Sequence, residues 1–251
     1  MEPDSSGLER FRRLVRRDGF AFAGADEVDP LLDALGGLED WADFAASWDR
    51  LEPDRYLIAT GRRRRRRHAV FAWDEAGPRN EGTGLRRLPP QPHFQTTVHN
   101  PLQGGIERWF APMEEVAVGS SFHTLARLGA SVFEALDGRA STPWFIEAHQ
   151  FRIEAAPGQA GEPTPEGMHR DGVDYVLVAM IARHNIERGT TSIHAPDRTT
   201  LGSFTLTRPR DIALVDDHRV LHGVTAVTPR DPAAAAHRDV LVLTYRRRPS
   251  A

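Results

Sequence analysis

Two potential metal ligands lie close together in EGMHRDGVDYV, residues 166–176. His169 and Asp171 are two positions apart, and side chains at i and i+2 of an extended segment point the same way. His222 follows in DDHRVLHGVTAV, which is typical of a strand that can face the first across an antiparallel barrel. Two histidines and one carboxylate on one side of a metal ion leave its other positions open, which is the ligand set of non-haem Fe(II) oxygenases. The alternative stays open, because the chain has 11 histidines and such a spacing also arises by chance.

A cation for a co-substrate is the second candidate feature. An open iron site needs an electron source to activate O2, and 2-oxoglutarate is the common one. Its far carboxylate needs a cation, which a planar guanidinium meets through two hydrogen bonds. Arg238 lies in HRDVLVLTYRR, one strand after His222, and shares a face with Thr244, whose hydroxyl can add a contact. Arg230 and Arg246 remain alternatives, as does an exposed, structural Arg238.

The sequence predicts helices in its first part and mostly strands after them. The first fifty residues show apolar side chains at helical spacing, and we expect a helical layer over residues 1–54. The pattern turns strand-like from Arg55 to Asp74, and a further helix is expected over residues 114–136. After Pro143, seven short β-rich runs follow with no helix between them, which favours an antiparallel double-sheet jelly roll.

Composition limits the class of protein. The chain has 251 residues, 40% of them hydrophobic and 27% charged, which suits one soluble globular domain over residues 1–251. Cysteine is absent, so disulfides, thiolate metal sites and cysteine nucleophiles are excluded. With no apolar leader and no membrane-length apolar run, we expect a cytoplasmic protein with no membrane partner. The 32 basic residues against 35 acidic ones give no overall attraction to nucleic acid.

Four stretches of the chain resemble the bacterial 2-oxoglutarate/Fe(II) dioxygenases typified by L-isoleucine hydroxylase. They are HQFRIEA (149–155), EGMHRDGVDYV (166–176), DDHRVLHGVTAV (216–227) and HRDVLVLTYRR (237–247). The resemblance implies an α+β fold with a double-stranded β-helix (jelly-roll, cupin-like) core over about residues 90–248, with N-terminal and flanking helices. It also implies Fe(II) at His169, Asp171 and His222, 2-oxoglutarate at Arg238, and O2 as the other co-substrate. Members of this group mostly hydroxylate free aliphatic amino acids.

The substrate contacts are expected near the metal motif. Gln150 and Arg152 share one face of the strand that precedes it, and an arginine there can meet an amino-acid carboxylate. Asp174, just after the motif, can meet an α-amine. Each of the three can equally be a structural polar group. We expect a small-molecule substrate; the same chemistry on a carrier-bound or peptidyl substrate, and a metal-containing binding protein without turnover, remain the alternatives. The oligomeric state is not readable from the sequence.

Six consecutive arginines, Arg62 to Arg67, are the remaining feature. Adjacent like charges repel and need acidic or anionic partners. The run leads directly into the apolar AVFAW, which a disordered basic tail would not do. If it is a strand, Arg64 and Arg66 lie on the face opposite to Arg65. We expect one face to be solvated and the other to pack on the barrel, where a guanidinium can meet an anionic substrate. A nucleic-acid contact is the weaker alternative, since no basic domain surrounds the run.

Overall fold

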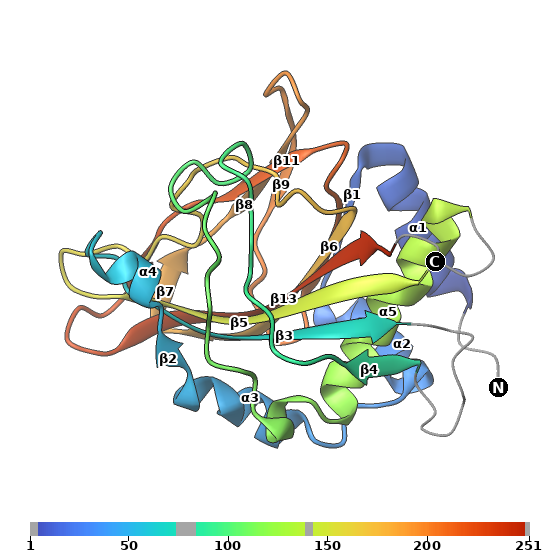
Figure 1. Ribbon diagram of the computed structural model, residues 1–251, viewed down its shortest axis with the longest axis horizontal. Helices are drawn as coiled ribbons and strands as arrows, with labels where there is room; N and C mark the ends of the chain where they lie inside the picture. Colours follow the sequence, from blue (N-terminus) through green and yellow to red (C-terminus); the bar gives the residue numbers. More distant parts are fainter. Residues whose placement is uncertain (1–4, 74–83, 139–142, 249–251) are drawn as a thin grey trace.

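Antiparallel strands form the frame of the molecule (Figure 1). The computed structural model describes residues 5–73, 84–138 and 143–248. Its largest sheet has eight strands, and β4 (Leu85–Arg87) pairs with β3 off the main path. Along that path the strands are β1 (Phe20–Ala23), β10 (Ile212–Asp216), β6 (Tyr175–His184), β13 (Ala236–Arg247), β5 (Trp144–Ala155), β3 (Arg64–Trp73) and β2 (Glu52–Pro53).

A smaller group of strands lies over the large sheet and closes the barrel. One sheet runs in the order β11 (Leu221–Val224), β8 (Thr191–His194) and β9 (Thr200–Phe204). A two-stranded sheet pairs β12 (Val227–Pro229) with β7 (Ile186–Arg188). Two layers of antiparallel strands with a pocket between them make a double-stranded β-helix, as expected.

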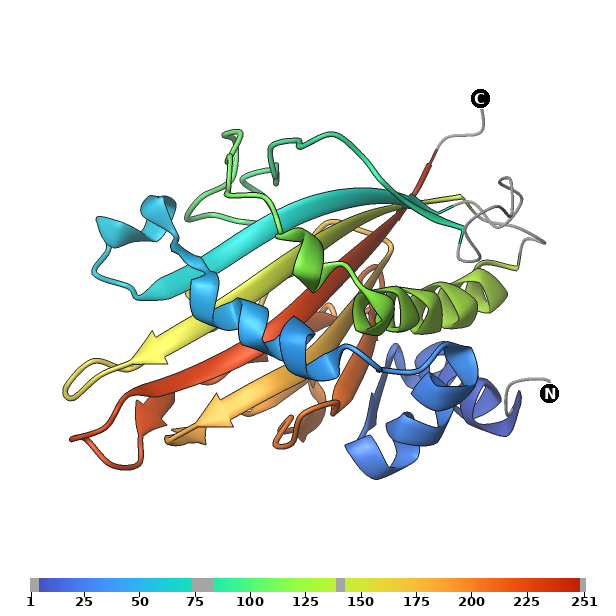
Figure 2. The ribbon, with the colours of Figure 1, turned by 90° about the horizontal axis from the view of Figure 1, so that it is seen from below.

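Helices cover the other face of the large sheet, as Figure 2 shows. They are α1 (Ser5–Asp18), α2 (Ala25–Leu35), α3 (Trp41–Ala46) and α5 (Ser120–Asp137). The short segments are η1 (Ser47–Arg50), α4 (Arg55–Ile58) and η3 (Glu115–Ala117). Phe133 of α5 stacks on Tyr175 of β6 at 4.6 Å between ring centroids, within one apolar cluster that joins helices and sheet. None of the helices in the described ranges is long and apolar enough to cross a membrane.

Some elements differ from the sequence-based expectation. The strand-like pattern from Arg55 is wrong at its start, because the Asp54 side chain accepts the amide of Tyr56 and begins the short helix α4. The strand itself begins at Arg64. The N-terminal helical layer is interrupted by β1, which pairs with β10, so the large sheet draws strands from well before residue 90.

The long helix also begins later than expected. The Asp40 carboxylate accepts both the Ser120 hydroxyl and the Ser121 amide, which fixes the start of α5. The helix ends at Gly138, which takes the left-handed conformation at φ 72°. The helix therefore extends one residue beyond its expected end at residue 136.

Candidate metal centre and pocket

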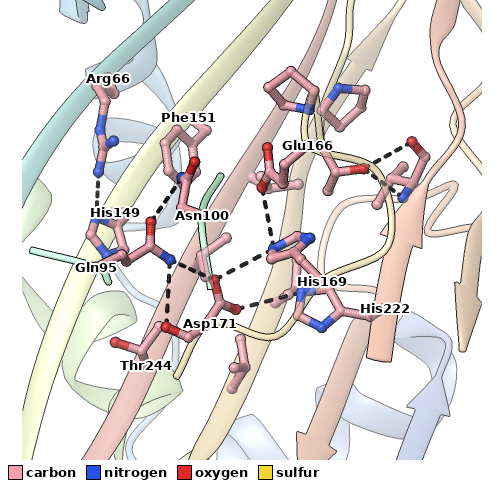
Figure 3. Close-up of a pocket in the computed structure, with 18 of the residues that line it drawn as sticks. Arg66, Gln95, Asn100, His149, Phe151, Glu166, His169, Asp171, His222 and Thr244 are labelled. Carbon is pink, nitrogen blue, oxygen red and sulfur yellow. Dashed lines mark hydrogen bonds and ion pairs between the residues drawn. The ribbon is translucent and has the colours of Figure 1, made fainter. Parts of the chain in front are cut away.

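His169 and His222 face each other across an antiparallel bridge. Each donates its amide to the other's carbonyl at 3.0 Å, and the two imidazole centroids are 4.5 Å apart. Asp171 lies in the turn that follows His169, where the Asp217 carboxylate accepts the amides of Asp171 and Gly172. The potential ligand atoms of the three expected residues all lie within 4.8 Å of one another. We call this group the triad; Figure 3 shows it at one side of a pocket.

The hydrogen bonds of the triad suit a metal ion. The His169 Nδ1 lies 3.0 Å from the Gly167 carbonyl, which only accepts, so Nδ1 carries a proton. This orientation directs Nε2 toward Asp171 Oδ1 at 3.6 Å, and Asp171 Oδ2 lies 3.5 Å from His222 Nε2. In metal sites a backbone carbonyl commonly accepts the other ring N–H of a ligating histidine and so fixes its tautomer. The donor set therefore fits Fe(II).

The two histidines have unequal proton affinities. Burial opposes a charge on His169, but the hydrogen bond and charge of Asp171, with the charge of Glu166, outweigh it and raise the pKa of His169 to about 9. Burial and the charge of His169 lower the pKa of His222 to about 4, against the opposing charge of Asp171. At neutral pH the triad thus holds a proton on His169, which a metal ion must displace.

Arg238 lines the same pocket as the triad, and so does Thr244 on the same face of β13. The Arg238 side chain is buried, with only 3% of the residue exposed. Within the described part of the chain, no carboxylate lies within 4 Å of its nitrogens, and its Nε has no hydrogen-bond partner. Burial and the charge of Arg183 lower the pKa of Arg238 to about 10, despite Asp239. A buried cation without an anionic partner suits the far carboxylate of 2-oxoglutarate.

The rival arginines are less suitable. Arg230 is exposed and approaches Glu187 at 4.0 Å, outside the pocket lining. Arg246 is an exposed residue at the end of the pocket-facing row of β13.

The three expected substrate contacts do not line the pocket. Gln150 points to the helical side of β5 and donates to the Ser47 hydroxyl at 2.7 Å. Arg152 shares that face and forms two hydrogen bonds with Asp239, at 2.8 and 2.7 Å. Asp174 accepts from the amide and the guanidinium of Arg247. All three expectations are corrected, because the side chains have structural partners outside the pocket.

The pocket-facing side of β5 instead carries residues that the sequence analysis did not select. Glu147, His149 and Phe151 alternate with the side chains above and line the pocket. His93 Nδ1 lies 2.6 Å and His68 Nε2 lies 3.3 Å from Glu147 Oε2. In the sequence, the E-x-H spacing of Glu147 and His149 on one strand could have indicated these residues. The structure places His68 opposite His149 in the β3–β5 register.

His68, His93, Glu147 and His149 are a second group with ligand types for a metal ion, again within 4.8 Å. The contact of Arg66 with this group argues against a four-ligand site. The Arg66 Nη2 lies 2.7 Å from His149 Nδ1, and a guanidinium only donates, so Nδ1 must accept. The neutral ring then carries its proton on Nε2, and no lone pair is left there for a metal. We call these four residues the Glu147 cluster and describe it as a hydrogen-bonded carboxylate.

The arginine run follows the strand alternation. Arg65 faces outward and donates to Glu154 at 2.7 Å, and Arg67 pairs with Glu114 at 3.4 Å. Arg64 and Arg66 line the pocket, and Arg64 forms two hydrogen bonds with Asp54. One face therefore packs on the barrel as expected, but the other is only partly solvated, because the Arg67 side chain is 14% exposed.

A double-stranded β-helix that presents two histidines and a carboxylate between its sheets has the architecture of a non-haem iron oxygenase. The sequence model of the 2OG-Fe dioxygenase family matches residues 45–244, and the chain belongs to that family. The resemblance noted in the sequence is thereby confirmed at the level of the family.

Individual proteins are similar to this chain in sequence or in fold. The structure of a bsmA homologue from Methylobium petroleophilum PM1 is 35% identical, with a TM-score of 0.83, over 96% of this chain and 93% of that one. IDO from Bacillus thuringiensis shares the fold, with a TM-score of 0.76 at 16% identity, over 96% of this chain and 99% of that one. The 3(1)-hydroxy-L-isoleucine 4-dioxygenase of Pantoea ananatis (strain AJ13355) is 30% identical over 159 residues, which span 62% of this chain and 64% of that protein.

Proposed function

We propose that this protein is an Fe(II)/2-oxoglutarate-dependent dioxygenase that hydroxylates an unactivated C–H bond of a free L-amino acid or a similar small metabolite. The observation that carries the proposal is the meeting of the triad with the buried, unpaired Arg238 in one pocket. The balanced reaction consumes the substrate, O2 and 2-oxoglutarate and yields the hydroxylated substrate, succinate and CO2.

Each residue has a distinct part in this reaction. His169, Asp171 and His222 would hold Fe(II), which with 2-oxoglutarate supplies the oxidising power for C–H hydroxylation. Arg238 would pair with the far carboxylate of 2-oxoglutarate, and Thr244 would add a hydroxyl contact. The walls between these polar groups are apolar and exclude water, which strengthens the charge pairing inside. They include Val173, Val176, Val178, Leu206, Val240 and Val242.

The relative from Pantoea ananatis supports an amino-acid substrate, because it is named for a hydroxylated L-isoleucine. The same chemistry on a carrier-bound or peptidyl substrate is the alternative, and a binding protein without turnover is the third possibility.

Succinate formation tests the proposal. The purified protein would be assayed with Fe(II), ascorbate and 2-oxoglutarate across a panel of free L-amino acids, with His169→Ala as the control. Amino-acid-dependent succinate that the variant does not produce would support the proposal. Bound iron without succinate from any free amino acid would contradict it and favour the tethered-substrate or binding-protein alternative.

A further inference from the structure

We infer that Arg66 and Arg108 form the subsite that binds a free carboxylate of the substrate. Both line the pocket that holds the triad, and Figure 3 shows Arg66 and His149 on the side away from His169 and His222. The inference rests on the proposed function, since it names the group by which that substrate is recognised.

Arg66 is a buried cation with an incomplete set of partners. The residue is 2% exposed, and its guanidinium carbon lies 3.6 Å from the ring centroid of Phe110 and 4.6 Å from that of Phe151. Its Nε has no hydrogen-bond partner, and Nη2 donates to the neutral His149. The nearest carboxylate, Asp54, is 3.9 Å from Nη1 and already accepts two hydrogen bonds from Arg64. Burying a guanidinium in this way is costly unless an anion completes the site.

Arg108 is also a buried cation with an incomplete set of partners. It is 1% exposed, and its two terminal nitrogens donate to the amide oxygens of Gln103 at 2.9 Å and Gln95 at 2.8 Å. Its Nε also has no partner. Both amides are neutral, so they hold the guanidinium in place without compensating its charge.

Charge counting gives the class of ligand. Three guanidiniums on this side of the pocket, from Arg64, Arg66 and Arg108, face two carboxylates, from Asp54 and Glu147. Glu166 lies 3.3 Å from His169 Nε2, and its charge also favours the charged form of Arg108. With a divalent metal ion at the triad to offset Asp171 and Glu166, one positive charge is left, which one monoanion neutralises. A planar carboxylate matches guanidinium donors.

The position of this subsite separates it from the co-substrate site. Gln95 accepts from Arg108 through Oε1, and its Nε2 lies 3.5 Å from Asp171 Oδ1. A carboxylate at the two arginines therefore anchors the substrate beside the triad. Arg238 remains available on β13 for 2-oxoglutarate. An amino acid esterified to a carrier has no free carboxylate, so the subsite favours a free acid over a carrier-bound substrate.

Comparing acids with amides tests the inference. Anaerobic protein loaded with Mn(II) and 2-oxoglutarate would be titrated calorimetrically with L-amino acids and with their carboxamides. We expect the best acid to bind about 100-fold more tightly than its amide, because the amide leaves buried charge unpaired. Arg66→Gln should lose this preference and keep its affinity for 2-oxoglutarate. Arg65→Gln is the matched control on the same strand, since its side chain is 42% exposed and pairs with Glu154.

Each other outcome has a defined meaning. Equal binding of acids and amides by the wild-type protein, or no binding of either, would overturn the inference, and neither measurement depends on the folding of a variant. Loss of 2-oxoglutarate rather than amino-acid binding in a folded Arg66→Gln protein would also overturn it. Tight binding of an acid without succinate formation would retain the subsite while contradicting the proposed function.

Discussion

Among single residues, the two histidines of the triad differ in their affinity for a proton because carboxylates lie beside them. Asp171 lies beside both imidazole rings, while Glu166 lies beside His169. The proton therefore resides on His169 rather than on His222. Proton release is consequently part of metal binding at neutral pH.

The pH dependence of metal affinity follows from this proton. Because the pKa of His169 is raised to about 9, the metal-free site is protonated below that pH, and a metal ion competes with the proton. The affinity for Mn(II) should rise about tenfold per pH unit between pH 6 and 8. Anaerobic titrations at several pH values would measure it, and a pH-independent affinity would contradict the account. Glu166→Gln removes one charge that raises this pKa, so it should weaken the dependence.

Metal stoichiometry distinguishes the triad from the Glu147 cluster. In the Glu147 cluster, Arg66 occupies Nδ1 of His149, and His68 and His93 direct ring N–H groups at the Glu147 carboxylate. We therefore expect wild-type protein and Glu147→Gln each to bind one Fe(II) per chain. His169→Ala should bind none. Elemental analysis of protein reconstituted without O2 would measure this; two ions in the wild type, or one retained by His169→Ala, would show that the Glu147 cluster holds a metal.

At the scale of elements, strand β5 shows what the sequence could and could not predict. Its range was predictable from an apolar run with β-branched and aromatic residues, and His169, Asp171 and His222 were predictable from a short motif. The sequence could not show which face of β5 points into the pocket, because both faces are largely buried and both carry polar residues. The sequence therefore points to Arg152, whereas Glu147, on the opposite face of the strand, lines the pocket. Arg66 came from a different strand, and its contact with His149 depends on β3 pairing with β5.

The docking of α5 on the large sheet depends on a close approach at Gly129. A Cβ there would lie 2.3 Å from the Tyr245 hydroxyl oxygen, which donates to the Ala126 carbonyl. Gly129→Ala should therefore destabilise the protein by about 1–3 kcal/mol, against the stabilising effect of alanine in an ordinary helix.

Urea denaturation would measure this effect. Tyr245→Phe removes the nearest clashing atom, while the ring carbon Cζ would still lie 2.6 Å from the new Cβ. Adding Gly129→Ala to that variant should therefore cost less than in the wild type without becoming neutral. A stabilising effect of Gly129→Ala would contradict this packing.

At the scale of the whole molecule, the buried histidines tie stability to pH. Burial, with the charges of His93, Arg66 and His68, holds the pKa of His149 well below its ordinary value of 6.5. Below pH 6.5 the unfolded chain therefore takes up a proton that the folded protein does not. The free energy of unfolding consequently decreases as the pH is lowered. His149→Gln removes this group, so its free energy of unfolding should change less between pH 7 and 5 than that of the wild type. Equal slopes from urea denaturation would contradict the burial of a neutral His149.

The two sheets bring together residues from distant parts of the chain. Arg66, His169 and Arg238 come from β3, the bridge to β11, and β13, and they meet in one pocket only after the sheets close. We propose that the dioxygenase reaction takes place in this pocket, at the triad.

Oxygen-isotope labelling tests that claim most directly. With ¹⁸O₂, 2-oxoglutarate and the amino acid that stimulates most succinate, we expect one labelled oxygen in succinate and one in the hydroxylated amino acid, with neither product formed by His169→Ala. Succinate that is absent, unlabelled or formed equally well by His169→Ala would contradict it.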